Sequence, residues 1–161
     1  MIKLEIDNSG RTYCEVYIKP HNSLIMKCVF FKIDTGADFS TISKSVLSDF
    51  GYSEGWIEAN KIASKFGIST ASGEVVASFY VPLNINIYGI ESVGHPFGII
   101  LDEEISLPKQ SCMGCKHVGI KKRDYRLLLG NDILSCFDMR TQRDSNIMIL
   151  EPRRNKTGKH G

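Results

Sequence analysis

Short apolar stretches separated by turn residues make up most of the chain, and their spacing is that of β-strands. Residues 11–19 carry apolar or small side chains at the even positions and charged residues or tyrosine at the odd ones. This period of two is typical of a half-buried strand. Residues 80–89 alternate in the same way, and Pro82 indicates an edge position there. Residues 24–33 are apolar on both alternating faces, which predicts a central strand.

Helical patterns are scarce by comparison. Residues 43–51 predict one short helix that begins at a Ser43 cap and ends at Gly51. Residues 61–78 predict a hairpin with its tip near residues 71–74. Further strands are expected at 96–101, 127–129 and 146–150. The pattern as a whole predicts a small, mostly-β domain with one or two short helices.

Two segments interrupt this pattern. Residues 102–126 are polar and lie between two expected strands, so we interpret them as an insertion. Residues 152–161 are basic and have no apolar periodicity, which predicts a disordered tail. A chain of 161 residues and 18.0 kDa has little room for a second core. We therefore expect a single domain over residues 1–151.

The composition narrows the class of partner. A net charge of +2 gives no global attraction to nucleic acid or to a membrane surface. No window holds the run of about 18 apolar residues that a membrane helix requires. The start MIKLEIDNSG has acidic residues and no apolar signal-peptide region. We therefore expect a cytoplasmic protein that binds neither nucleic acid nor membranes and keeps its five cysteines as reduced thiols.

The stretch CVFFKIDTGADFST, residues 28–41, contains the main candidate for chemistry. An apolar run ends at the acid Asp34, which Thr35 and Gly36 follow, and a second acid stands at Asp38. Glycine tolerates unusual backbone angles and lets another chain approach closely, while nearby N–H groups can bind a carboxylate. Asp34 could equally be a simple turn cap.

Three segments in order resemble the retropepsin-like aspartic proteases, from about Thr12 to about Leu150. FFKIDTGADFSTIS is similar to their catalytic turn, STASGEVVA to the flap that closes over substrate, and RLLLGNDIL to the element that packs behind the turn. DTGAD matches retroviral proteases, whereas LLGNDIL is closer to Ddi-type proteases and their bacterial relatives. The resemblance implies a small, closed, barrel-like β fold with one lobe per chain.

The resemblance also implies an activity. The chain has a single Asp-Thr-Gly, so a complete site would need a homodimer in which Asp34 faces its own copy. Two such carboxyls share one proton, activate a water and protonate the leaving amine of a peptide bond. The implied function is therefore that of an aspartic endopeptidase acting on a protein or peptide. The alternative is a silent peptide-binding or dimerisation module of the same fold.

The resemblance assigns roles to individual positions. Catalysis is expected at Asp34, Thr35 and Gly36, substrate binding at Ala37, Asp38, Ala71, Ser72 and Gly73, and structural support at Leu128, Leu129 and Gly130. The segment 71–73 could instead be an ordinary hairpin loop. Retroviral enzymes have an arginine after the last glycine, where this chain has Asn131. This difference leaves the positioning of Asp38 open.

The other cysteines and histidines give weaker predictions. Cys112, Cys115 and His117 could supply three ligands to zinc, could act in redox chemistry, or could be surface thiols. No other cofactor is expected. His21 and His95 stand beside prolines and are predicted to be solvent-exposed. Cys14, Cys28 and Cys136 fall in expected strands or beside a helix, which predicts that they belong to the core.

Overall fold

Strands dominate the fold, and the helices are short. The computed structural model describes residues 1–69, 75–100, 109–112, 115–118 and 127–153, with backbone only in 63–69, 75–78, 109–112 and 115–118. The strands are β1 (Ile2–Glu5), β2 (Tyr13–Lys19), β3 (Lys27–Ile33), β4 (Thr41–Ser43), β5 (Ile62–Ser69), β6 (Val75–Ile87), β7 (Ile90–Ile100), β8 (Lys109–Cys112), β9 (Cys115–Val118), β10 (Leu128–Leu129), β11 (Phe137–Gln142) and β12 (Ile147–Pro152). The helices are α1 (Lys44–Asp49), α2 (Glu54–Asn60), α3 (Asn131–Leu134) and the 3₁₀ helix η1 (Arg143–Ser145).

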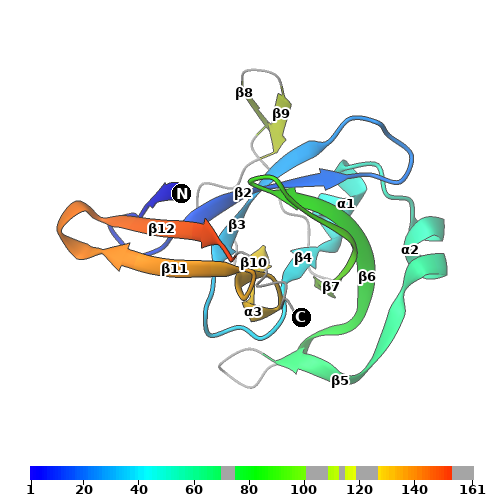
Figure 1. The fold of residues 1–161 in the computed structure, drawn as a ribbon. Helices are drawn as coiled ribbons and strands as arrows, with labels where there is room; N and C mark the ends of the chain where they lie inside the picture. Colours follow the sequence, from blue (N-terminus) through cyan, green and yellow to red (C-terminus); the bar gives the residue numbers. More distant parts are fainter. Residues whose placement is uncertain (70–74, 101–108, 113–114, 119–126, 154–161) are drawn as a thin grey trace, which may run out of the picture.

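Nine strands form one sheet in the order β10-β4-β7-β6-β2-β3-β9-β8, with β5 paired to β6 (Figure 1). Strand β10 also pairs with β3, in parallel, so that the path β3-β10-β4-β7-β6-β2 returns to β3. The small, mostly-β fold predicted from the sequence is confirmed. The single-domain boundaries stay a prediction.

The core lies where the alternating strands turn their apolar positions inward. In β2, Cys14, Val16 and Ile18 are buried, as the period of two predicts. In β6 the buried positions are Val81, Leu83, Ile85 and Ile87. Side chains from β3, β4, β7, α1 and α3 belong to the same cluster. The core therefore reaches the carboxyl end of β3, directly before Asp34.

Strand β3 begins later than the apolar run predicts. Ile18 pairs with Lys27, and residues 20–26 form the connection after β2, where no strand pairing is recorded. Within that connection Leu24 is 93% exposed and Ile25 is 73% exposed. The predicted start at residue 24 is wrong, because the register of β2 against β3, rather than apolarity, decides where pairing begins.

The hairpin expected from residues 61–78 is confirmed in its backbone, since β5 and β6 pair antiparallel. The edge position inferred from Pro82 is wrong, because β6 is an interior strand. On one side β6 pairs with β5 as far as Tyr80 and with β2 from Asn84, and Pro82 falls between the two pairings. On the other side it lies opposite Pro96. Neither proline has an N–H group, so the pair fits a position of the β6–β7 ladder at which no N–H bonds are exchanged. The pairing of β6 with β7 continues on both sides of it.

The helix expected at residues 43–51 is α1. Ser43 stands at its N-cap, but its side chain makes no capping hydrogen bond. The sequence pattern missed α2, which packs Ile57 into the core. Its start carries a signal, because the Ser53 hydroxyl oxygen accepts a hydrogen bond from the Trp56 N–H at 3.1 Å.

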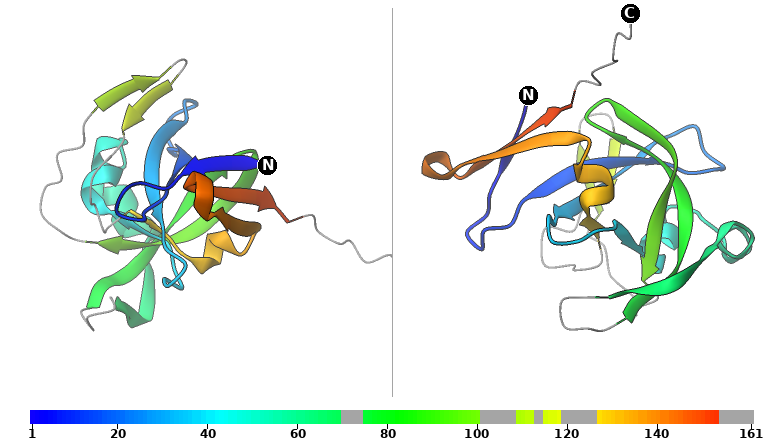
Figure 2. Two further views of the ribbon diagram at one scale, coloured as in Figure 1. Left: turned by 90° about the vertical axis from the view of Figure 1, so that its left-hand side faces the viewer. Right: turned by 60° about the horizontal axis from the view of Figure 1, so that its bottom comes forward.

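Strands β1 and β11 lie where the sequence analysis expected none, whereas β12 covers the strand expected at 146–150. The first and last strands lie together in a sheet of order β1-β12-β11, in which Ile2 pairs with Leu150 (Figure 2). Within the polar segment 102–126, β8 and β9 form a hairpin that extends the large sheet beyond β3. None of the helices in the described part of the chain is long and apolar enough to cross a membrane.

Candidate active site

Asp34 follows the last residue of β3 and begins a turn in which its backbone N–H and carbonyl groups are both hydrogen-bonded. The Asp34 N–H donates to the Leu129 carbonyl oxygen at 3.0 Å, and the Ala37 N–H donates to the Asp34 carbonyl oxygen at 3.2 Å. The Gly36 N–H donates to the Asp34 Oδ1 at 3.0 Å. These bonds fix both the backbone of Asp34 and the orientation of its carboxyl group.

The residues of this turn lie at the surface. Asp34 and Ala37 are half-buried, and Thr35, Gly36 and Asp38 are exposed. The strand that leads into the turn is anchored in the core, since Ile33 is buried. A carboxyl group that is accessible, yet attached to a rigid strand, can act as a general acid or base on a bound molecule.

Gly130, at the start of α3, lets the helix approach the turn from behind. A Cβ atom at this position would lie 2.7 Å from the carbonyl carbon and oxygen of Phe39 and 2.8 Å from the Ala37 carbonyl oxygen. The close approach allows the Asn131 N–H to donate to the Ala37 carbonyl oxygen at 2.8 Å, and the Asp132 N–H to donate to that of Asp38 at 3.1 Å. Glycine is therefore required here because any side chain would push the helix off the turn.

Asn131 binds the turn with its side chain as well. Its Nδ2 group donates to the Thr35 carbonyl oxygen at 2.9 Å. Asn131 stands where retroviral enzymes have an arginine, and here the residue contacts the backbone of the Asp-Thr-Gly segment itself. The sequence comparison alone did not give this contact.

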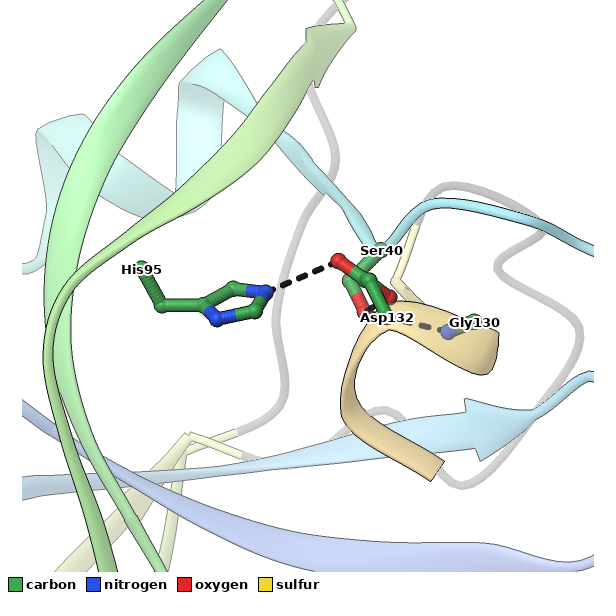
Figure 3. Close-up of polar contacts among 4 residues, drawn as sticks. All are labelled: Ser40, His95, Gly130 and Asp132. Atoms are coloured by element: carbon green, nitrogen blue, oxygen red, sulfur yellow. Dashed lines mark hydrogen bonds and ion pairs between the residues drawn. The ribbon is translucent and has the colours of Figure 1, made fainter. Parts of the chain in front are cut away.

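A second set of polar side chains lies beside the turn and was missed by the sequence analysis. The Ser40 hydroxyl donates to the Asp132 Oδ1 at 2.8 Å and accepts a hydrogen bond from the Gly130 N–H at 3.0 Å. The other carboxylate oxygen, Oδ2, lies 2.8 Å from the His95 Nε2. Figure 3 shows the imidazole reaching from β7 toward Asp132 on α3, with Ser40 on the other side of the carboxylate.

The electrostatics of this cluster favour a charged Asp132. Burial by itself raises the pKa of the Asp132 carboxyl. The hydrogen bonds from His95 and Ser40 outweigh this effect, so the pKa lies below its ordinary value of 3.8. Only 14% of the Asp132 side chain and 16% of the His95 side chain are exposed. The result is a nearly buried carboxylate with a hydrogen-bond partner on each oxygen.

The expectation of a solvent-exposed His95 is therefore wrong. Its Gly-His-Pro context reads as a turn, but the segment continues β7, and the ring lies against Phe97 at 5.5 Å between centroids. His21 is exposed, as expected, and stacks on Trp56. An acid in the first turn of a helix, as at Asp132, was visible in the sequence, but nothing local indicates that His95 would pair with it.

An aromatic pair flanks the turn on another side. Phe39 is 49% exposed, and its ring lies edge-on to that of Tyr80 on β6, with 5.9 Å between centroids. Exposed large apolar side chains are informative when they lie beside a candidate site. The sequence analysis named neither residue.

For several expected site residues the structure describes either no atoms or the backbone alone. Ala71, Ser72 and Gly73 lie outside the described residues. For the zinc candidates the backbone alone is described: Cys112 and Cys115 face each other in register at one end of the β8–β9 hairpin, and His117 pairs with Gln110. Among the described residues no group of three or more His, Cys, Asp or Glu could hold a metal ion.

The remaining support residues and cysteines lie as follows. Leu129 and Gly130 are buried and Leu128 is half-buried, and β10 pairs with both β3 and β4. Cys14 and Cys28 are buried, as expected, and burial raises the pKa of the Cys28 thiol to about 12. Cys136 is exposed, so its predicted place in the core is wrong.

Comparison with solved structures shows which fold the chain has. The chain is similar in structure to a retropepsin-like aspartic protease from Rickettsia conorii, with a TM-score of 0.56, 19% sequence identity, and coverage of 92% of this chain and 88% of that one. No family model matches the sequence. No curated protein matches it either. At this identity the likeness shows the fold: the chain has the fold of the retropepsin-like aspartic proteases.

Proposed function

We propose that this protein is an aspartic endopeptidase that acts as a homodimer. The observation that carries the proposal is the Asp34 turn: a surface carboxyl group, oriented by the Gly36 N–H, at the end of a buried strand and backed by Gly130. The retropepsin-like fold agrees with this function. One such turn per chain requires a second copy to complete the site.

In the proposed dimer the two Asp34 carboxyls lie about 3 Å apart and hold one proton between them, because two like charges at that distance cannot both ionise. The ionised member accepts a proton from a water, whose oxygen attacks the peptide carbonyl carbon. The protonated member donates its proton to the carbonyl oxygen, which gives a tetrahedral diol. As the C–N bond breaks, the carboxyl that took the water proton protonates the leaving amine, and the other carboxylate takes back a proton from the diol, so that the pair again holds one proton. No covalent intermediate with the protein forms.

The neighbouring residues have supporting roles in this proposal. Thr35 contacts its counterpart across the two-fold axis, and Gly36 lets the substrate backbone lie close to the carboxyls. Ala37 and Asp38 bind the substrate main chain, and the segment 71–73 covers it. Phe39 and Tyr80 add an apolar surface beside the turn, which favours substrates with an apolar side chain near the cleaved bond.

The first test is digestion of a peptide library by the wild-type protein and by Asp34→Asn, read by mass spectrometry from acidic to neutral pH. We expect the wild type to cleave and the variant to lose cleavage altogether, because an amide cannot exchange the proton. Asp49→Asn is the matched control, since Asp49 is an exposed acid at the end of α1 and should be dispensable. Equal cleavage by wild type and Asp34→Asn would contradict the proposal.

A mixing experiment tests whether the site is shared. When wild-type and Asp34→Asn chains are co-expressed in equal amounts and assort at random, about a quarter of the dimers carry two copies of Asp34. Activity per wild-type chain should therefore fall by about half, whereas a site within one chain predicts no change. A dimer that binds library peptides without cleaving them would instead establish the peptide-binding module.

A further inference from the structure

His95 is connected to the turn of Asp34 through a continuous series of hydrogen bonds. The imidazole Nε2 lies 2.8 Å from the Asp132 Oδ2, and the Ser40 hydroxyl lies 2.8 Å from the Asp132 Oδ1. The same hydroxyl accepts the Gly130 N–H at 3.0 Å. Each contact joins a different part of the chain, so the series spans β7, α3 and the segment between β3 and β4 (Figure 3).

The series ends on the backbone that holds the turn. Gly130 begins α3, whose Asn131 and Asp132 N–H groups bind the carbonyl oxygens of Ala37 and Asp38. Ser40 is fully buried and stands two residues beyond Asp38. Asp132 is therefore connected to the turn by two routes, through the helix and through Ser40.

The state of His95 decides what faces the Asp132 carboxylate. Among the described residues, the imidazole contacts the Asp132 carboxylate from α3 and the Phe97 ring on its own strand, and His95 is paired with Leu83 of β6. A protonated imidazole faces the carboxylate with a positive charge, whereas a neutral one offers only an N–H dipole, so protonation strengthens the attraction between the two groups. Removing the imidazole leaves a nearly buried carboxylate short of a partner, which is costly.

We infer that His95 is a positioning residue for the Asp34 turn and that its charge state is transmitted to this turn through Asp132, Ser40 and Gly130. The inference rests on the function proposed above, because the turn matters for catalysis only if Asp34 reacts. His95 itself lies on β7 and is not assigned any contact with the substrate. It acts on the geometry of the reacting carboxyl and not on the chemistry.

Kinetics of two variants separate positioning from folding. We expect His95→Leu to lower kcat by about tenfold to a hundredfold while KM changes little, because a small displacement of a reacting group has effects of this size. His95→Gln keeps a side-chain donor for Asp132 and should restore most of kcat, but without the pH dependence that an ionisable histidine introduces. His21→Gln is the matched control and should behave as wild type, since His21 is exposed and stacks on Trp56. A loss of kcat in His95→Leu that only follows the unfolded fraction would overturn the inference.

A second measurement does not depend on activity. In an NMR titration we expect the amide signals of Gly36, Gly130 and Asn131 to shift with the same midpoint as the His95 ring. Ser40→Ala keeps the contact between His95 and Asp132 but removes one of the two routes from Asp132 to the turn, so the pH-dependent shift of the Gly36 amide should become smaller. His21 in the same spectra provides an internal control, because its midpoint should not appear in these amides.

The two proposals fail in different ways. Coupled shifts in a protein that cleaves no peptide would support the positioning role and contradict only the endopeptidase. Cleavage that depends on Asp34, together with amide signals that ignore the His95 midpoint, would overturn the positioning role alone.

Discussion

The two ends of β3 are connected to the rest of the chain in contrasting ways. Before the strand, residues 20–26 form a loop whose described hydrogen bonds are mostly internal, such as that from the Ser23 N–H to the Pro20 carbonyl oxygen at 3.2 Å. After the strand, residues 34–40 form a turn bound by Leu129, Gly130, Asn131 and Asp132, which lie about ninety residues further on in the sequence. The entry loop exposes Leu24 and Ile25, whereas the exit turn holds the Asp34 carboxyl in a defined orientation.

The comparison shows that the apolar character of a segment does not by itself decide whether the segment is buried or held in place. Leu24 and Ile25 belong to the same apolar run as the strand, yet they lie in the connection before it and are exposed. The exit turn contains mostly polar and small residues, yet its carbonyl groups are paired by a second segment. A connecting segment takes a fixed conformation when groups from a distant part of the chain form hydrogen bonds with its backbone.

The largest expected effect is on the free energy of unfolding, and it compares a leucine behind the exit turn with a leucine in the entry loop. Leu129→Ala, behind the exit turn, should lower the free energy of unfolding by about 2–5 kcal/mol, because Leu129 is 1% exposed and its removal leaves a cavity. Leu24→Ala in the entry loop should change it by less than about 0.5 kcal/mol. Urea unfolding of both variants measures the two values, and similar losses would contradict the contrast.

The next effect tests the close approach of α3 to the exit turn. Gly130→Ala should destabilise the protein by about 1–3 kcal/mol, since the new methyl group would meet the backbone of Phe39 at 2.7 Å. Activity should fall as well, because the turn must shift. Gly55→Ala is the matched control: its Cβ would have 4.0 Å to the nearest atom, Ser53 Oγ, and in α2 it should stabilise by up to about 1 kcal/mol. Thermal unfolding distinguishes the two signs.

The smallest effect depends on pH. The pKa of Asp132 is below its ordinary value of 3.8 in the folded protein, so the carboxylate stabilises the fold above that value, and the stabilisation is lost as the pH falls through the folded pKa. Asp132→Asn should therefore cost about 1 kcal/mol at pH 7, where charge-assisted bonds become neutral ones, and less near pH 3. Denaturant unfolding at both pH values measures this difference. A cost that grows as the pH falls would show that the direction is wrong, and Asp138→Asn at the exposed ion pair with Arg153 is the control.

The sequence predicted the fold class and the central candidate because both are local in origin. The alternation in residues 11–19 and 80–89 follows directly from the two faces of a strand, and the buried positions of β2 and β6 agree with it. The segment Asp34–Gly36 stands out since an acid, a hydroxyl and a glycine follow an apolar run. Even α2 had a local signal at Ser53 that was overlooked.

The tertiary structure alone decided the rest, and the reason is that these contacts join residues far apart in the chain. His95 and Asp132 are separated by 37 positions, and Ser40 and Asp132 by 92. No periodicity connects them, and the Gly-His-Pro context of His95 indicates a turn rather than a nearly buried contact with a carboxylate. The start of β3, the interior place of Pro82 and the return of β10 to β3 are likewise matters of register. The order of residues determined which strands form and where an acid ends one of them, while the packing of those strands determined which side chains hold that acid in place.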